Sequence, residues 1–116
     1  MPRDPRAFLW DIADAAADIA QFIDRQDAEG YAQTALVRAA VERKFEIVGE
    51  ALGQLARLDP ALAARIPDYR RIIAFRNILI HGYASIDHAE AWRIATTALP
   101  NLNAAVVALM NELGAP

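Results

Sequence analysis

Cysteine is absent from this sequence, and histidine is scarce. The 116 residues include no cysteine and only two histidines, His81 and His88. Without thiolates the chain can form neither a disulfide framework nor a zinc site of the cysteine type, and two imidazoles argue against a histidine-rich metal site. We therefore expect no bound metal and no cofactor.

Residues that interrupt helices are also few. Five glycines and six prolines stand among 116 residues, whereas hydrophobic residues make up 55% of the chain. Ala, Leu and Ile dominate, and no segment alternates as a strand does, so the composition favours helices over sheets. We expect an all-α protein, and the length suits a single domain over residues 1–116.

Two kinds of long apolar segment are expected to be missing. We expect no apolar run of membrane-spanning length, because charged residues recur along the chain. The start, MPRDPRAFLW, does not read as a signal peptide, because Asp4 and Asp11 fall where the apolar core of such a peptide belongs. We therefore expect a cytoplasmic protein.

The net charge of −3 argues mildly against a general nucleic-acid coat protein, but the charge is unevenly distributed. Residues 38–76 hold eight basic and five acidic side chains, a net of +3. The remainder holds four basic and ten acidic side chains, a net of −6. The basic excess leads into residues 76–83, although ordinary solvated helix faces would give the same pattern.

Apolar spacing and capping residues predict a series of helices. Asp4, Asp59 and Asp87 stand where N-caps belong, the first two directly before a proline. Gly49 and Gly53 are four residues apart inside a predicted helix, where close packing of another helix would justify them. The expected helical segments are 5–30, 31–57, a short turn at 60–65, 69–81 with a stop at Gly82, and a last region from 87 that Pro100 kinks or splits.

The residues with the most chemistry gather at positions 76–83, Arg-Asn-Ile-Leu-Ile-His-Gly-Tyr. Arg76 brings a permanent cation whose planar fork suits a phosphate. His81 brings a group that takes or gives a proton near neutral pH. The two suffice for metal-free cleavage of RNA: His81 activates the 2′-hydroxyl or protonates the leaving 5′-oxygen, and Arg76 holds the phosphoryl oxygens.

A single helix aims these two side chains imperfectly. His81 follows Arg76 by five residues, which is about 140° around an ideal helix. Either the helix distorts near Gly82, or a two-fold dimer brings two such helices to one cleft. Tyr83 follows by seven residues and so shares the face of Arg76. The alternative is that Arg76 and His81 only satisfy carbonyls and the dipole at a helix C-terminus.

Two other side chains allow more than one interpretation. Asn77 is a candidate catalytic support that hydrogen-bonds across the cleft or orients His81, or else a polar group of an interface. Tyr83 could stack on a base, offer a hydroxyl for modification, or pack as a plain aromatic residue. His88 is expected at the surface. In addition, six apolar residues nearly encircle the helix 69–81, which favours a homodimer because one core uses only a stripe.

Residues 76–83 resemble the Arg-x4-His-x-Tyr motif of the HepT-like toxins, a branch of the HEPN ribonuclease superfamily. The resemblance extends to residues 45–51, 69–76 and 87–100 and to the Asp-Pro-Arg start, and so covers nearly the whole chain. It implies an antiparallel bundle of about four to five helices that dimerises with the motif at the dimer cleft. It also implies ribonuclease toxin activity, with Arg76 and His81 as the catalytic residues.

The resemblance further implies a partner, a minimal nucleotidyltransferase antitoxin that adenylylates the motif tyrosine, here Tyr83, and silences the toxin. Gly82 departs from the family pattern, in which an acidic or other polar residue often stands at this position. Two other functions remain open: a non-catalytic helical dimer that binds a nucleotidyltransferase, and an RNA-binding module without cleavage. The intact Arg76 and His81 favour the toxin, whereas the acidic net charge favours the non-catalytic dimer.

Overall fold

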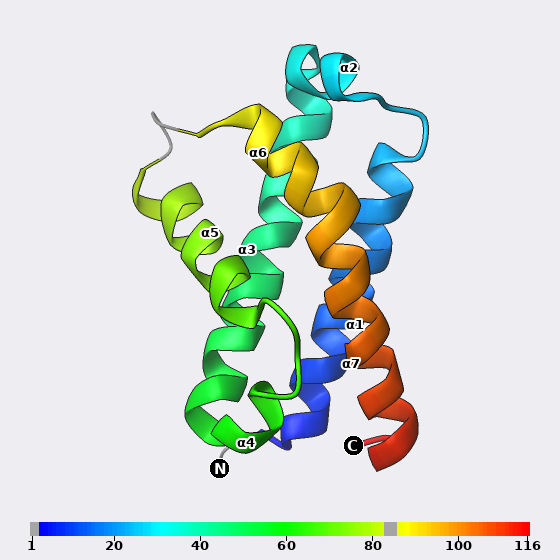
Figure 1. The fold of residues 1–116 in the computed structure, drawn as a ribbon, viewed down its shortest axis with the longest axis vertical. Coiled ribbons are helices and arrows are strands. Elements are labelled where there is room, and N and C mark those ends of the chain that lie inside the picture. Colours follow the sequence, from blue (N-terminus) through cyan, green and yellow to red (C-terminus); the bar gives the residue numbers. More distant parts are fainter. Residues whose placement is uncertain (1–2, 83–85) are drawn as a thin grey trace.

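The computed structural model describes residues 3–82 and 86–116, which form helices joined by short turns (Figure 1). Neighbouring long helices run in opposite directions, and α2 and α4 are short connecting helices. These described residues contain no strand, which confirms the prediction of an all-α protein. The elements are α1 (Pro5–Ile23), α2 (Ala28–Gln33), α3 (Ala35–Leu58), α4 (Pro60–Ala63), α5 (Tyr69–His81), α6 (His88–Arg93), the π-helical η2 (Ile94–Ala98) and α7 (Leu99–Leu113).

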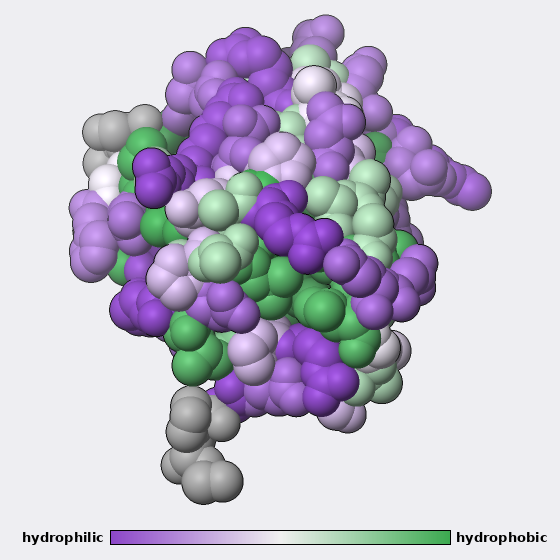
Figure 2. Space-filling view, turned by 60° about the horizontal axis from the view of Figure 1, so that its bottom comes forward, coloured by the Kyte–Doolittle hydropathy of each residue, from purple (hydrophilic) through white to green (hydrophobic). Residues whose placement is uncertain are grey.

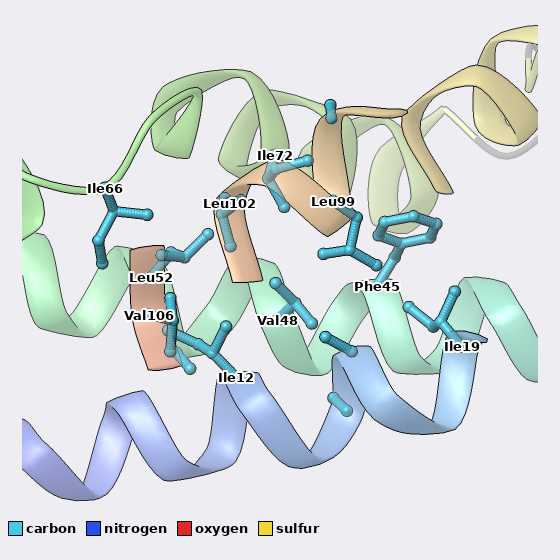
Figure 3. Packing of buried hydrophobic residues seen from close by; sticks show 14 of the residues in the cluster. Ile12, Ile19, Phe45, Val48, Leu52, Ile66, Ile72, Leu99, Leu102 and Val106 are labelled. Carbon is cyan, nitrogen blue, oxygen red and sulfur yellow. The ribbon is translucent and has the colours of Figure 1, made fainter. Parts of the chain in front are cut away.

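The hydrophobic core lies between the long helices, with α3 packed against both α1 and α5. α7 completes the bundle by packing against α1. Figure 3 shows side chains from these four helices meeting, among them Ile12, Phe45, Ile72 and Leu102, all of which are buried. Burial of each such side chain contributes about 1.5–3 kcal/mol, so this packing is the main stabilising term.

Aspartates start most of the helices, as predicted. The carboxylate of Asp4 accepts a hydrogen bond from the backbone N–H of Arg6 at 2.9 Å. Asp59 does the same for Leu62 at 3.1 Å, and Asp87 for Ala89 at 2.9 Å. Each such cap satisfies a backbone donor that the first helical turn leaves free and is worth about 0.5–2 kcal/mol.

The predicted boundary between the first two helices, near Gly30, is wrong. α1 ends at Ile23, and Gly30 lies inside α2, where its N–H donates to the side chain of Asp27 at 2.7 Å. Tyr31 belongs to α2 as well and is fully buried, with its ring 5.6 Å from that of Trp92. Asp27 therefore caps a separate short helix, which ties the α1–α3 connection to α6.

Pro100 divides the last helical region without breaking it. In η2 the N–H of Leu99 donates to the carbonyl of Ile94, five residues back. Proline has no N–H, and its ring clashes with the carbonyl four residues earlier in a regular α-helix. The wider turn accommodates Pro100 at the start of α7, so the predicted kink or split takes the form of a π-helical segment.

The expectation that no apolar run reaches membrane-spanning length is wrong for this region. The continuous helix His88–Leu113 is long and apolar enough to cross a membrane by length and composition, and residues 94–111 carry no charge. Its residues Ile94, Leu102 and Val106 are buried in the core. A core helix of a helical bundle meets the same criteria, so length and composition are weak evidence for a membrane span.

Apolar side chains also reach the surface. In the view turned toward the end that carries α4, hydrophobic residues gather centrally and are bordered by hydrophilic ones (Figure 2). Folded proteins commonly expose apolar atoms, so exposure alone does not mark a functional face. Within residues 3–82 and 86–116, the exposed large hydrophobic residues are Trp10, Leu36, Leu58, Ile78, Val107 and Leu113.

Candidate active site

α3 and α5 approach closely where Gly49 faces Arg76. A Cβ added to Gly49 would lie 2.3 Å from the Cβ of Arg76 and 3.4 Å from the carbonyl oxygen of Ile72. The close packing expected at the two glycines is therefore confirmed for Gly49. It is wrong for Gly53, where an added Cβ would have as its nearest neighbour a terminal nitrogen of Arg57 at 3.7 Å.

The side chain of Arg76 is held at several points. Its Nη2 forms an ion pair with Oε2 of Glu50 at 2.8 Å, and its Nη1 donates to the side-chain oxygen of Asn77 at 3.1 Å. The other carboxylate oxygen of Glu50 accepts a hydrogen bond from Gln54 at 2.9 Å. Asn77 thus contacts Arg76, and a connected set of polar groups fixes the guanidinium.

Arg76 lines a hollow of about 250 Å³ between α1, α3 and α5. Three arginines and three carboxylates share its wall, together with apolar side chains such as Phe8 and Ile80. Each guanidinium has a carboxylate partner, so the six charges cancel within the hollow. The pairs are Arg3–Asp11 at 2.7 Å, Arg43–Glu46 at 3.6 Å and Arg76–Glu50 at 2.8 Å.

His81 lies apart from this hollow. It is the last residue of α5, it is exposed, and it does not line the hollow. The helix remains regular to its end, because the N–H of Gly82 donates to the carbonyl of Ile78 at 2.7 Å, four residues back. The distortion considered for Gly82 therefore does not occur within α5, and the structure does not bring His81 to the hollow beside Arg76.

The outer face of α5 carries an exposed stripe, here defined as Ala74, Asn77, Ile78 and His81. The spacing of these residues places them on one side of the helix. Of the six apolar residues that nearly encircle α5, three are buried and two are half-buried, and Ile78 is 47% exposed. The apolar surplus on α5 is therefore narrower than the sequence indicated and centres on Ile78.

Tyr83, the candidate for modification, lies outside the described residues. His88 was expected at the surface, which is wrong: it is half-buried, and its Nδ1 is buried without a hydrogen-bond partner among the described residues. Burial raises the pKa of nearby Glu42, and the charges of His88 and Arg38 oppose that shift.

Comparison with protein families matches residues 12–109 to the family described as Ribonuclease HepT-like. This chain belongs to the HepT-like ribonuclease family. The match confirms the resemblance seen in residues 76–83 and supports ribonuclease activity on RNA.

Individual relatives agree with the family. "Putative RNase MJ1380" of Methanocaldococcus jannaschii is 33% identical over 100 residues, which cover 86% of this chain and 91% of the relative. "Probable ribonuclease HepT" of Thermococcus cleftensis is 30% identical over 102 residues, which cover 88% and 92%. No solved structure matches.

Sequence reasoning missed the side chains that surround Arg76 in this HepT-like ribonuclease. Glu50 and Gln54 come from α3 and meet Arg76 only because α3 and α5 pack at Gly49. The available signal was Gly49 itself, a glycine inside a helix that directly precedes a carboxylate. Across residues 3–82 and 86–116, no group of three or more potential metal-ligating side chains is arranged to hold an ion.

Proposed function

We propose that this HepT-like ribonuclease is a metal-independent endoribonuclease and the toxin of a toxin–antitoxin pair. The observation that carries the proposal is the guanidinium of Arg76, half-buried and fixed at the wall of a hollow. His81 stands exposed on the same helix. A fixed guanidinium suits the phosphoryl oxygens of RNA, and an exposed imidazole suits proton transfer.

The proposed reaction is an internal transesterification. His81 takes the proton of the 2′-hydroxyl, the 2′-oxygen bonds to phosphorus, and the bond from phosphorus to the 5′-oxygen breaks. A second imidazole gives its proton to the leaving 5′-oxygen, while Arg76 stabilises the charge on the phosphoryl oxygens. The products are a 2′,3′-cyclic phosphate and a 5′-hydroxyl. DNA lacks the attacking hydroxyl and is not a substrate.

The same proposal includes a homodimer. Arg76 faces α3 whereas His81 lies on the exposed stripe, so one chain does not present both to a single phosphate. A two-fold axis beside Asn77 and His81, the edge of the exposed stripe that borders Arg76, would bring two copies of α5 together and carry the partner's imidazole toward Arg76. The apolar Ile78 in the middle of the stripe supports this choice of face.

Regulation by a minimal nucleotidyltransferase antitoxin in the cytoplasm is the final part of the proposal, and it rests on the family motif. The partner would adenylylate Tyr83. The added phosphate would be attracted to the guanidinium of Arg76 and would compete with the phosphate of RNA. Such an inhibited state requires no refolding of the helices.

One observation favours a second function, a non-catalytic dimer that only binds the nucleotidyltransferase. Glu50 already neutralises Arg76, and the six charges of the hollow cancel. A surface of this kind has little long-range attraction for RNA. The two functions differ in one measurable respect, which is whether the purified chain cuts RNA.

The test is cleavage of a labelled RNA in EDTA by wild type, Arg76→Ala and His81→Ala. The control substrate is the same oligonucleotide with 2′-deoxyribose in place of ribose. We expect wild type to yield cyclic phosphate ends only on the ribose substrate. Loss of His81 should lower the rate about 10²–10⁴-fold, as for other acid–base groups. Loss of Arg76 should lower it on the order of 10²–10³-fold. Full activity in either folded variant, or a need for a divalent metal, would contradict the mechanism.

A further inference from the structure

Glu50 is the carboxylate of the hollow that contacts the candidate catalytic arginine. Its two oxygens are both engaged, one by Arg76 at 2.8 Å and the other by the amide of Gln54 at 2.9 Å. Gln54 follows Glu50 by four residues on α3 and lies above it on the same face of the helix. The carboxylate is therefore anchored on its own helix before it reaches across to α5.

The rest of the Arg76 side chain depends on α3 as well. Its Cβ lies against Gly49, and its Nε is buried with no hydrogen-bond partner among the described residues. These contacts hold the stem of the side chain, but they do not by themselves fix the plane of the guanidinium about its Cδ–Nε bond. Glu50 and Asn77 are the acceptors that determine where those nitrogens point.

We propose that Glu50 is a positioning residue for RNA cleavage, which holds the guanidinium of Arg76 toward the hollow and weakens RNA binding in doing so. This inference rests on the proposed ribonuclease function. A fixed donor speeds the chemical step, because it needs no reorientation in the transition state. A carboxylate beside the phosphate-binding group also repels phosphate, so its charge raises KM.

A role for Glu50 as the proton acceptor itself agrees less well with the structure. Both of its oxygens already accept hydrogen bonds, one of them from a cation. With both oxygens occupied in this way, the carboxylate presents neither of them directly to a 2′-hydroxyl. The pH dependence separates the two roles: a positioning residue leaves the acidic limb of the rate profile in place, whereas loss of a base removes it.

The chain offers a matched control in Glu46. It lies on the same helix, lines the same hollow and forms its own ion pair with Arg43, at 3.6 Å. Glu46→Gln and Glu50→Gln each remove one negative charge from the hollow, but the partner of Arg76 is lost only in the second. An effect of charge should appear in both variants, and an effect of positioning in Glu50→Gln alone.

The experiment measures kcat and KM for a labelled RNA. Both variants should lower KM by a similar factor. Only Glu50→Gln should lower kcat, by on the order of 10–100-fold, because small displacements of a catalytic group cost that much. Gln54→Ala should also lower kcat, by a smaller factor than Glu50→Gln does. An unchanged kcat in Glu50→Gln, an equal loss in Glu46→Gln, or loss of the acidic limb would overturn the inference.

A second readout does not depend on cleavage. The Nε–H of Arg76 is a buried donor, so its NMR signal, identified by its loss in Arg76→Lys, should exchange slowly with water. Glu50→Gln should broaden that signal or speed its exchange, and Glu46→Gln should not. If wild type cuts no RNA, the proposed function fails. If wild type cuts RNA but Glu50→Gln leaves both kcat and the Arg76 signal unchanged, only this inference fails.

Discussion

Arg76 shows how one side chain takes part in both packing and chemistry. Its stem occupies the space that the absent side chain of Gly49 leaves open, and its charged end meets Glu50 at the wall of the hollow. Arginine suits this position because its long stem packs against the helix while its planar guanidinium donates hydrogen bonds to more than one partner. Lysine carries a compact ammonium group. It could not contact Glu50 and a phosphate at the same time with the geometry of the planar guanidinium.

Tyr83 is the residue at which regulation can be separated from catalysis. Tyr83→Phe should keep most of the cleavage activity, because the phenolic hydroxyl has no role in the proposed reaction. It should also escape silencing, because the hydroxyl that accepts the adenylyl group is gone. Wild type and variant are incubated with the nucleotidyltransferase and ATP, and intact mass and RNA cleavage are then recorded.

Tyr69→Phe is the control for that experiment, since Tyr69 begins α5 and its hydroxyl accepts a hydrogen bond from Arg70 on the surface. This variant should be modified and silenced like wild type. If Tyr83→Phe gains the mass of the adenylyl group and loses activity, another residue is the target.

The sequence identifies the candidate catalytic residues but not the groups around them. Arg76 and His81 stand out because a charged residue and a rare histidine share a short, otherwise apolar segment. Glu50 and Gln54 belong to α3, 26 and 22 residues before Arg76. Their contact with the site depends on the distance between two helices, and local spacing carries no information about that distance.

Among the elements, the bounds of α5 were predictable and those of the α1–α3 connection were not. Pro67-Asp68 and Gly82 bound α5 with strong local signals, and the helix is Tyr69–His81 as expected. The apolar spacing of α1 stops at Ile23, the last residue of the helix, whereas the prediction continued the helix to Gly30. Asp27 caps a separate helix, α2, at this point. That helix also depends on the packing of Tyr31 against Trp92, which is a tertiary contact that local spacing does not predict.

The glycines of α3 give a paired prediction about helix packing. In Gly49→Ala the new Cβ would overlap the Cβ of Arg76, so α3 and α5 must separate. Overpacking of this kind costs about 1–3 kcal/mol, which outweighs the gain in helix propensity of up to about 1 kcal/mol. In Gly53→Ala the nearest atom is at 3.7 Å, so only the gain should remain.

Chemical denaturation of the two variants and wild type measures both effects. Gly49→Ala should have the lower midpoint and Gly53→Ala the higher one, at equal slopes. Stabilisation of both variants by similar amounts would show that the close approach at Gly49 does not constrain the two helices.

At the scale of the whole molecule, α5 is an edge helix. The described molecule measures 41 × 28 × 22 Å, and α5 packs mainly against α3, with its far side at the margin of the bundle (Figure 1). The exposed stripe lies on its outer face, where a second copy can approach without rearrangement of the core. A stable contact between two copies buries about 800 Å² on each, so it must extend beyond these four residues.

Ile78→Asp tests the proposed dimer. A carboxylate in the middle of the exposed stripe would face its own copy across the two-fold axis, and two like charges there oppose association. We expect a monomer by light scattering at micromolar concentration and a loss of RNA cleavage, with α-helix content unchanged. Leu36→Asp, at a position on α3 that is 82% exposed, should change neither property. A wild-type monomer under these conditions would count against the dimer.

Tyr31 makes the stability of the folded protein depend on pH in the alkaline range. It is fully buried, its hydroxyl has no partner among the described residues, and burial with the nearby charge of Glu42 raises its pKa to about 12. The unfolded chain loses this proton near pH 10, roughly the value of a free tyrosine. The contribution of Tyr31 to stability is therefore complete below about pH 10 and is lost as pH rises toward 12.

Tyr31→Phe should accordingly flatten the fall in stability above pH 10, roughly the free tyrosine pKa. It should also stabilise the protein at neutral pH by about 1 kcal/mol, because a buried hydroxyl without a partner is removed. Urea unfolding between pH 7 and 11 gives both quantities. Alkaline limbs that run parallel in wild type and variant would show that Tyr31 does not ionise on unfolding.

The π-helical η2 also has a consequence for alignment. A turn that closes from Leu99 to Ile94 contains one residue more than an α-helical turn, yet α6 and α7 still turn Ala91 and Leu102 to the core. Removal of one residue within 94–98, in a chain with another residue in place of Pro100, would restore a regular helix and leave both flanks facing as before. An alignment with any relative whose helix is regular here should therefore place a one-residue gap in this turn, with no compensating shift in α7.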